Sequence, residues 1–193
     1  MKYNFNKNFK KGFTLVETLV AISIFSASLL AVMAVLSSGI ASTNYTKTKL
    51  TASYLAQEGI EFIRNMRDTY VLYDVTSAQN GWNTFNTKLT GASCQTTGCY
   101  FDDQSLDYNS RNQAITLITP VACGGPCPQL KYDSVTGKYG YNNLWQNTVF
   151  TRKISITPIA GGNEVKVTST VSWTQGSGSY TEVFSENLFN WVE

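Results

Sequence analysis

The amino-acid sequence predicts an α+β fold in which a long N-terminal helix carries an antiparallel β-sheet on its second half. Three observations support this prediction. An apolar run begins at residue 13, a helical apolar pattern continues it to residue 68, and β-rich runs close the chain after residue 147. The 193 residues suffice for one modest globular domain beside the N-terminal segment.

Residues 1–12 form a basic leader that contains no acidic residue. Its cations are Lys2, Lys7, Lys10 and Lys11. The formal net charge of the whole chain is +2, but acidic residues outnumber basic ones once the leader is set aside. The rest of the chain lacks the clustered Lys and Arg that nucleic-acid binding requires. We therefore predict no nucleic-acid partner.

Residues 13–40 are predicted to form a transmembrane helix. Leu19–Ile40 alone gives about 33 Å of helix, and a bilayer core is about 30 Å thick. The leader lysines on one side, against only Lys47 and Lys49 close on the other, place the N-terminus in the cytoplasm. The alternatives are a plain uncleaved anchor and a secretory signal peptide cleaved near Ser38–Ala41. The apolar run exceeds the roughly 7 to 15 residues of a signal peptide.

Glu17 is the single charge at the head of this run, since the next charged residue is Lys47. A charge inside a membrane span costs about 2.5 to 3.5 kcal/mol. Thr14 and Glu17 fit a capping box, and the helix dipole contributes up to about 1 kcal/mol, but neither neutralises the carboxylate. If the chain is cut after Gly12, the new α-amino group of Phe13 lies one helical turn from Glu17. The same amine on a neighbouring copy would supply a cation.

The residues Lys11-Gly12-Phe13-Thr14-Leu15-Val16-Glu17, followed by an apolar helix, resemble the class III signal of type IV pilins and type II secretion pseudopilins. The resemblance implies a pilin-like fold, cleavage by a prepilin peptidase between Gly12 and Phe13, and N-methylation of Phe13. It also implies that Glu17 serves subunit registration and assembly. Many major pilins kink this helix at a proline, whereas this chain has none before Pro120. A minor pilin or pseudopilin fits that departure at least as well as a major subunit.

Residues 41–68 are predicted to continue the helix and to carry the globular domain. Apolar residues at helical spacings predict one packed face, made of Leu50, Tyr54, Leu55, Phe62, Ile63 and Met66. Arg64 is spaced to pair with Glu61 and Asp68 on the solvent face. Gly59 costs about 1 kcal/mol relative to alanine, and we expect it to allow close packing or a slight bend.

Residues 69–147 are predicted to be a variable loop region. Asn80-Gly81 is a turn signal, and Trp82 and Phe85 are expected to pack the region against the long helix. Three carboxylates gather in one stretch, at Asp102, Asp103 and Asp107. Calcium prefers oxygen ligands, but the spacing and the glycine of an EF-hand are missing. We favour a solvated loop and predict no metal site.

All four cysteines, Cys94, Cys99, Cys123 and Cys127, lie in this middle region. Disulfides are favoured over a zinc site, because the predicted compartment is oxidising and the spacings are not those of a zinc ribbon. Four cysteines allow three connectivities, of which we favour the local pairs Cys94–Cys99 and Cys123–Cys127. Such short loops gain little chain entropy, so we expect the bridges to rigidify exposed loops.

Residues 148–193 are predicted to form the antiparallel β-sheet. Three β-rich runs, separated by glycine-containing turns, alternate apolar and polar residues. They occupy about 147–157, 164–174 and 179–192. Their short connections predict an antiparallel meander, and we expect one face to bury Trp173 and Trp191 against the long helix.

The sequence contains no histidine, no P-loop and no Gly-x-Ser-x-Gly motif. We predict no enzymatic activity and no cofactor. The resemblance implies a minor pilin or pseudopilin that is a single-pass inner-membrane protein before assembly and part of an extracytoplasmic, cell-surface filament afterwards. Its implied partners are the prepilin peptidase, other pilin or pseudopilin subunits, the inner-membrane assembly platform and the lipid bilayer. The alternative is a membrane-tethered extracytoplasmic binding module that never polymerises.

Overall fold

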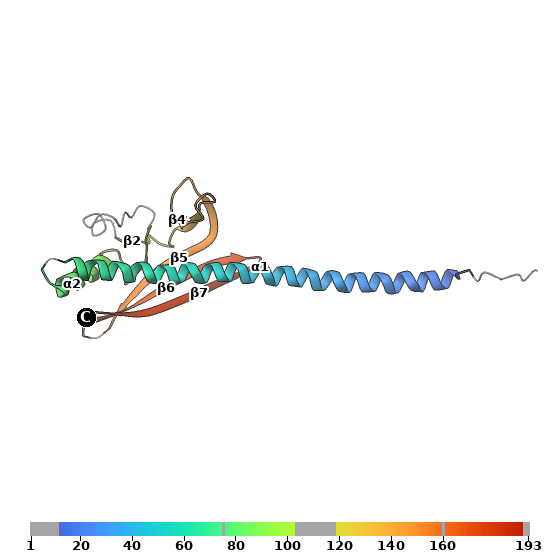
Figure 1. Ribbon diagram of the computed structural model, residues 1–193, viewed down its shortest axis with the longest axis horizontal. Coiled ribbons are helices and arrows are strands. Elements are labelled where there is room, and N and C mark those ends of the chain that lie inside the picture. Colours follow the sequence, from blue (N-terminus) through green and yellow to red (C-terminus); the bar gives the residue numbers. More distant parts are fainter. Residues whose placement is uncertain (1–11, 75, 103–118, 160, 191–193) are drawn as a thin grey trace, which may run out of the picture. The chain divides into compact units, whose positions relative to one another are not determined.

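The computed structural model describes residues 12–74, 76–102, 119–159 and 161–190 (Figure 1). It confirms the predicted fold class, a long N-terminal helix with an antiparallel sheet packed on its second half. The chain divides into two compact units, Met1–Thr46 and Lys47–Glu193. The long helix, α1 (Leu15–Tyr73), contributes residues to both units.

Helix α1 runs for 59 residues without a proline. It begins after Thr14, whose Oγ1 accepts a hydrogen bond from the backbone N–H of Glu17 at 3.2 Å, as an N-cap residue does. Hydroxyl groups inside the apolar stretch donate to carbonyls one turn earlier. Ser23 and Ser28, for example, donate over 2.8 Å to the carbonyls four residues before them. These hydroxyls are therefore satisfied within the helix itself, as a lipid environment requires.

The second half of α1 packs on the sheet through a face that includes small residues. Ala52 and Ala56 are completely buried, and a Cβ at Gly59 would lie only 2.3 Å from Ser169 Oγ. The predicted apolar face is wrong in two places, because Leu50 and Tyr54 are 55% and 64% exposed. The helix approaches the sheet through its small residues, which turns these two large side chains to the opposite face.

Within the described residues, seven strands form one antiparallel sheet, whose last three strands are the predicted meander. Figure 1 shows these three long strands beside the second half of α1. The strands are β1 (Cys99–Tyr100), β2 (Val121–Ala122), β3 (Gln129–Tyr132), β4 (Tyr139–Gly140), β5 (Gln146–Pro158), β6 (Glu164–Gln175) and β7 (Gly178–Phe189). On β6, alternate residues are buried, among them Val167, Val171 and Trp173. Trp191 lies outside the described residues.

The middle region contains a second helix, α2 (Ala78–Gly91), which the expectation of a loop region missed. Ser77 caps this helix by accepting a hydrogen bond from the backbone N–H of Asn80. The Asn80-Gly81 pair is part of the helix, and a Cβ at Gly81 would lie 2.3 Å from the backbone oxygen of Tyr70. The glycine therefore permits a close approach of α2 to α1. Trp82 and Phe85 are buried in the shared core, as expected.

Two disulfides, Cys94–Cys99 and Cys123–Cys127, have the local connectivity favoured from the sequence. Residues 95–97 and 124–126, between the paired cysteines, are exposed as expected. The cysteines themselves are buried, and Cys94 and Cys99 belong to the main core. Backbone hydrogen bonds hold both bridges to the sheet. Ile156 N–H donates to the carbonyl of Cys94, and Cys123 N–H donates to the carbonyl of Gly98, each at 3.0 Å.

Candidate functional site

The predicted processing site lies immediately before α1. Gly12, Phe13 and Thr14 precede the first helical residue, and all three are exposed, with Phe13 81% exposed. A peptidase needs an accessible and extendable backbone, which a helix interior does not offer. The Gly12–Phe13 peptide bond meets that requirement. The leader lysines Lys2, Lys7, Lys10 and Lys11 lie outside the described residues.

Glu17 lies in the first turn of α1 and is exposed. Its backbone N–H is capped by Thr14 Oγ1, which is one half of the predicted capping box. Within the part of the chain that the structure describes, the Glu17 carboxylate itself has no hydrogen-bond or ion-pair partner. Glu17 thus presents a negative charge, available to an outside cation, at the head of an apolar helix.

The first unit exposes an apolar surface along α1. Every residue from 12 to 44 is exposed, including large side chains such as Leu19, Ile24, Phe25, Leu30 and Val35. A monomeric soluble protein rarely leaves so much contiguous apolar surface uncovered. Among the described residues, α1 is the one helix long and apolar enough to cross a membrane. Such a surface is typical of a membrane anchor or of a protein interface.

A buried cation links the second half of α1 to the sheet. Arg152 on β5 is 1% exposed, and its Nη1 lies 2.6 Å from Glu58 Oε2 on α1. The same nitrogen donates to the carbonyl of Leu55 at 3.2 Å, and the guanidinium carbon lies 4.1 Å from the ring centroid of Phe101. The sequence analysis predicted alternating apolar and polar residues in this strand but assigned no role to Arg152. The alternation along β5 places Arg152 on the same buried face.

Burial of the neighbouring Tyr141 raises the pKa of its phenol to about 12, although the positive charge of Arg152 acts in the opposite direction. The neutral phenol is therefore retained through the physiological pH range. Arg152, Glu58 and Tyr141 form part of the seam between helix and sheet, which holds the globular unit on α1.

Further ion pairs attach the edge strand β7 to α1. Arg64 contacts both Glu61, as predicted, and Glu186 on β7. The hydrogen bond that Arg64 donates to Glu186 is the main reason that the pKa of Arg64 is raised. The predicted pairing of Arg64 with Asp68 is wrong, since Asp68 Oδ1 lies 2.6 Å from Nε of Arg67 instead. Glu186 draws the Arg64 guanidinium toward the sheet and away from Asp68.

No metal centre is found in the described part of the chain, where no three His, Cys, Asp or Glu side chains are grouped. Of the three carboxylates considered for calcium, Asp102 is exposed, whereas Asp103 and Asp107 lie outside the described residues. The four cysteines are paired with one another and offer no thiolate.

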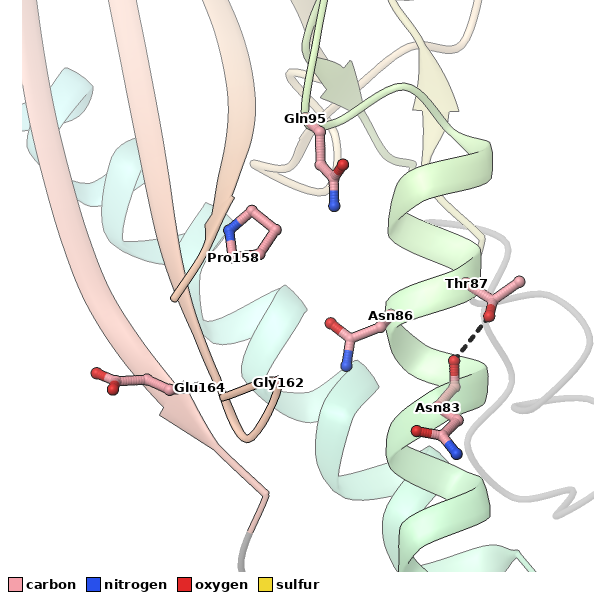
Figure 2. A pocket seen from close by; sticks show the side chains of 7 residues that line it. All are labelled: Asn83, Asn86, Thr87, Gln95, Pro158, Gly162 and Glu164. Carbon is pink, nitrogen blue, oxygen red and sulfur yellow. Dashed lines mark hydrogen bonds between the residues drawn. The ribbon is translucent and has the colours of Figure 1, made fainter. Parts of the chain in front are cut away.

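A polar groove lies between α2 and the turn that joins β5 to β6 (Figure 2). It has a volume of about 420 Å³ and is lined by Asn83, Asn86, Thr87, Gln95, Pro158, Gly162 and Glu164. A hydrogen bond joins the two sides of the groove, because the indole N–H of Trp82 on α2 donates to the carbonyl of Gly162 in the β5–β6 turn at 2.8 Å. Sequence reasoning missed the groove because α2 was missed. The apolar spacing of Trp82, Phe85 and Leu89, with amides between them, is the signal that would have predicted an amphipathic helix.

Comparison with known proteins identifies the N-terminal segment. Residues 7–42 match the prokaryotic N-terminal methylation motif, which includes Gly12, Phe13 and Glu17 and most of the apolar stretch. This match confirms the resemblance to the class III signal of type IV pilins. The chain therefore carries the signal of a type IV pilin-like prepilin, and this signal indicates a structural, membrane-anchored subunit in preference to an enzyme. No curated protein and no solved structure matches the chain.

Proposed function

We propose that this chain, which carries a prepilin-type N-terminal methylation motif, is a minor pilin or pseudopilin. In this proposal a prepilin peptidase cleaves it between Gly12 and Phe13, and Phe13 is then N-methylated. The mature subunit assembles through α1 into a type IV pilus-like filament or a secretion pseudopilus. The observation that carries the proposal is the motif match over residues 7–42, with an accessible Gly12–Phe13 bond beside an unpaired Glu17.

Before assembly, the apolar half of α1 lies in the inner membrane with its N-terminus in the cytoplasm. The basic leader supports this orientation, because positive residues flank the cytoplasmic end of a span. Extraction from lipid exposes a large apolar helix surface, and neighbouring α1 helices in a filament would cover it again. The inner-membrane assembly platform and other pilin or pseudopilin subunits are the partners that this transfer requires.

Glu17 favours the transfer of α1 from the membrane into a filament of like subunits. In lipid, its carboxylate is an unpaired charge that costs about 2.5 to 3.5 kcal/mol. In a filament, the α-amino group of Phe13 from a neighbouring subunit would pair with it. Removal of the charge should therefore weaken the preference for the filament over the membrane by up to about 300-fold.

The experiment compares Glu17→Ala with Thr18→Ala, a variant in the same helical turn that keeps the charge. The mass of the mature N-terminus and the amount of each variant in sheared filaments are measured in the same cells. We expect both variants to be cleaved and methylated, and Glu17→Ala alone to be depleted from filaments. Filament incorporation of Glu17→Ala equal to that of the wild type would refute the pairing mechanism.

The N-terminal mass also tests the wider proposal against the membrane-tethered binding module. A mature chain that begins with methyl-Phe13 supports a filament subunit. An intact Met1, or a start near Ser42, in cells with an active prepilin peptidase would exclude the pilin-type pathway.

A further inference from the structure

The groove between α2 and the β5–β6 turn contains amide side chains that are each held at one end by the protein. Asn86 donates from Nδ2 to the carbonyl of Trp82 at 3.0 Å. A backbone carbonyl can only accept, so this bond orients the amide and leaves Asn86 Oδ1 for another partner. Figure 2 shows Asn86 reaching from α2 toward Gly162, across the space that the groove occupies.

Gln95 and Asn83 each make one hydrogen bond to another side chain, although both residues are exposed. Gln95 Nε2 donates to Thr90 Oγ1 at 3.2 Å, and Figure 2 shows its side chain pointing into the groove from above. Asn83 Oδ1 accepts from Gln79 Nε2 at 3.1 Å. The opposite ends of these amides have no hydrogen-bond partner within the described residues. A ligand would therefore meet one amide of fixed orientation, Asn86, beside two that each already hold one hydrogen bond, and the fixed amide lowers the entropy lost on binding.

The chemistry of the lining narrows the class of ligand. None of the seven lining residues is cationic, so the groove offers no counter-charge to a phosphate or another anion. Pro158 is the single apolar side chain among them, which is too little for a lipid or an aromatic ligand. Glu164 is the one charge, and one of its oxygens already accepts from Asn187 at 2.8 Å. A partly solvated carboxylate alone holds a cation weakly.

We propose that this groove is a binding site for a neutral saccharide. A sugar hydroxyl both donates and accepts hydrogen bonds. It can therefore donate to the amide oxygens of Asn86 and Gln95 and accept from the amide nitrogen of Asn83. The volume of about 420 Å³ lies in the range of small-ligand sites. A few net hydrogen bonds in an open groove correspond to a dissociation constant on the order of 1 mM. This inference goes beyond the proposed filament function and does not depend on it.

The test uses the full-length protein in lauryldimethylamine oxide micelles, because alkyl glycoside detergents would themselves compete for the site. Maltose, cellobiose, lactose and di-N-acetylchitobiose are titrated by saturation-transfer NMR, with spermidine and inorganic phosphate as charged probes. We expect at least one disaccharide to bind. Asn86→Ala and Gln95→Ala should each weaken its binding by roughly five- to tenfold, and the exposed Asn143→Ala should leave it unchanged.

Three results would overturn the proposal. The first is no binding of any of the four disaccharides at concentrations far above millimolar. The second is equal disaccharide affinity in the wild type, Asn86→Ala and Gln95→Ala. The third is binding of spermidine or phosphate without binding of a disaccharide. Because Asn86 and Gln95 lie on separate segments, a folding defect in one variant leaves the other as a valid test. Failure here leaves the mass of the mature N-terminus, and hence the filament proposal, unaffected.

Discussion

Substitution of Gly59 by alanine tests the close contact between α1 and β6. In an open helix this change would stabilise the protein by about 1 kcal/mol. Here the new Cβ would lie 2.3 Å from Ser169 Oγ and 2.9 Å from Ile154 Cδ1, and both neighbours are completely buried. Overpacking of a buried site costs about 1 to 3 kcal/mol. We place this clash at the upper end of that range and subtract the gain in helix propensity. The free energy of unfolding should therefore fall by about 2 kcal/mol.

The assay is denaturant unfolding of the full-length protein in detergent, followed by tryptophan fluorescence, since Trp82 and Trp173 are buried in the globular unit. Gly91→Ala is the matched control, because no atom lies within 4 Å of its added Cβ. We expect that control to be neutral or to stabilise the protein by up to about 1 kcal/mol.

A double-mutant cycle with Ser169→Ala isolates the contact. Ser169 Oγ is buried without a hydrogen-bond partner, so its removal alone should be neutral or mildly stabilising. In the Ser169→Ala background, Gly59→Ala loses its closest clash, and its cost should fall below about 1 kcal/mol. The reasoning is refuted if Gly59→Ala stabilises the wild type, or if its cost is the same in both backgrounds.

Two further predictions concern the seam between helix and sheet. Glu58→Gln should destabilise the protein by about 3 kcal/mol, because it leaves the buried Arg152 cation uncompensated. Arg152→Met should cost less, since Glu58 is 36% exposed and can reach water; equal losses in urea unfolding would contradict this asymmetry. Burial raises the pKa of Tyr141 to about 12 from an ordinary 10.0, so its contribution to stability is complete below pH 10 and is lost as the pH rises toward 12. Burial also raises the pKa of Tyr70 and Tyr139, so a titration of tyrosinate absorbance should show several late-titrating phenols. Tyr141→Phe should remove the latest of them, and an unchanged curve would contradict the burial argument.

Much of the fold could be predicted because its long elements have strong local patterns. The apolar run without proline predicted α1, and the alternation of Val165, Val167, Val171 and Trp173 predicted β6. The β6 range of about 164–174 compares with Glu164–Gln175 in the structure. Such patterns report a repeating environment along one element, which a single sequence can reveal.

The missed features depend on contacts between distant segments. Asn80-Gly81 is a turn signal locally, but packing against the backbone of α1 makes the glycine useful inside α2. The groove combines side chains from α2, from the loop at Gln95 and from the β5–β6 turn. No local sequence pattern predicts that these segments lie close together. The motif of residues 7–42 could be recognised because Gly12, Phe13 and Glu17 are contiguous with the apolar helix, whereas cleavage after Gly12 stays a prediction.

The short strands β1 and β2 have a consequence for engineering. Tyr100 pairs with Val121 and Cys99 with Ala122, so the chain leaves the sheet and returns to it at adjacent positions. One disulfide, Cys94–Cys99, lies at the start of β1, and the other, Cys123–Cys127, follows β2 directly. The entropy of closing a loop grows slowly with its length. Lengthening the chain between these two strands would therefore add little to the entropic cost of closing the segment, while the strand pairing and the two disulfides hold its ends.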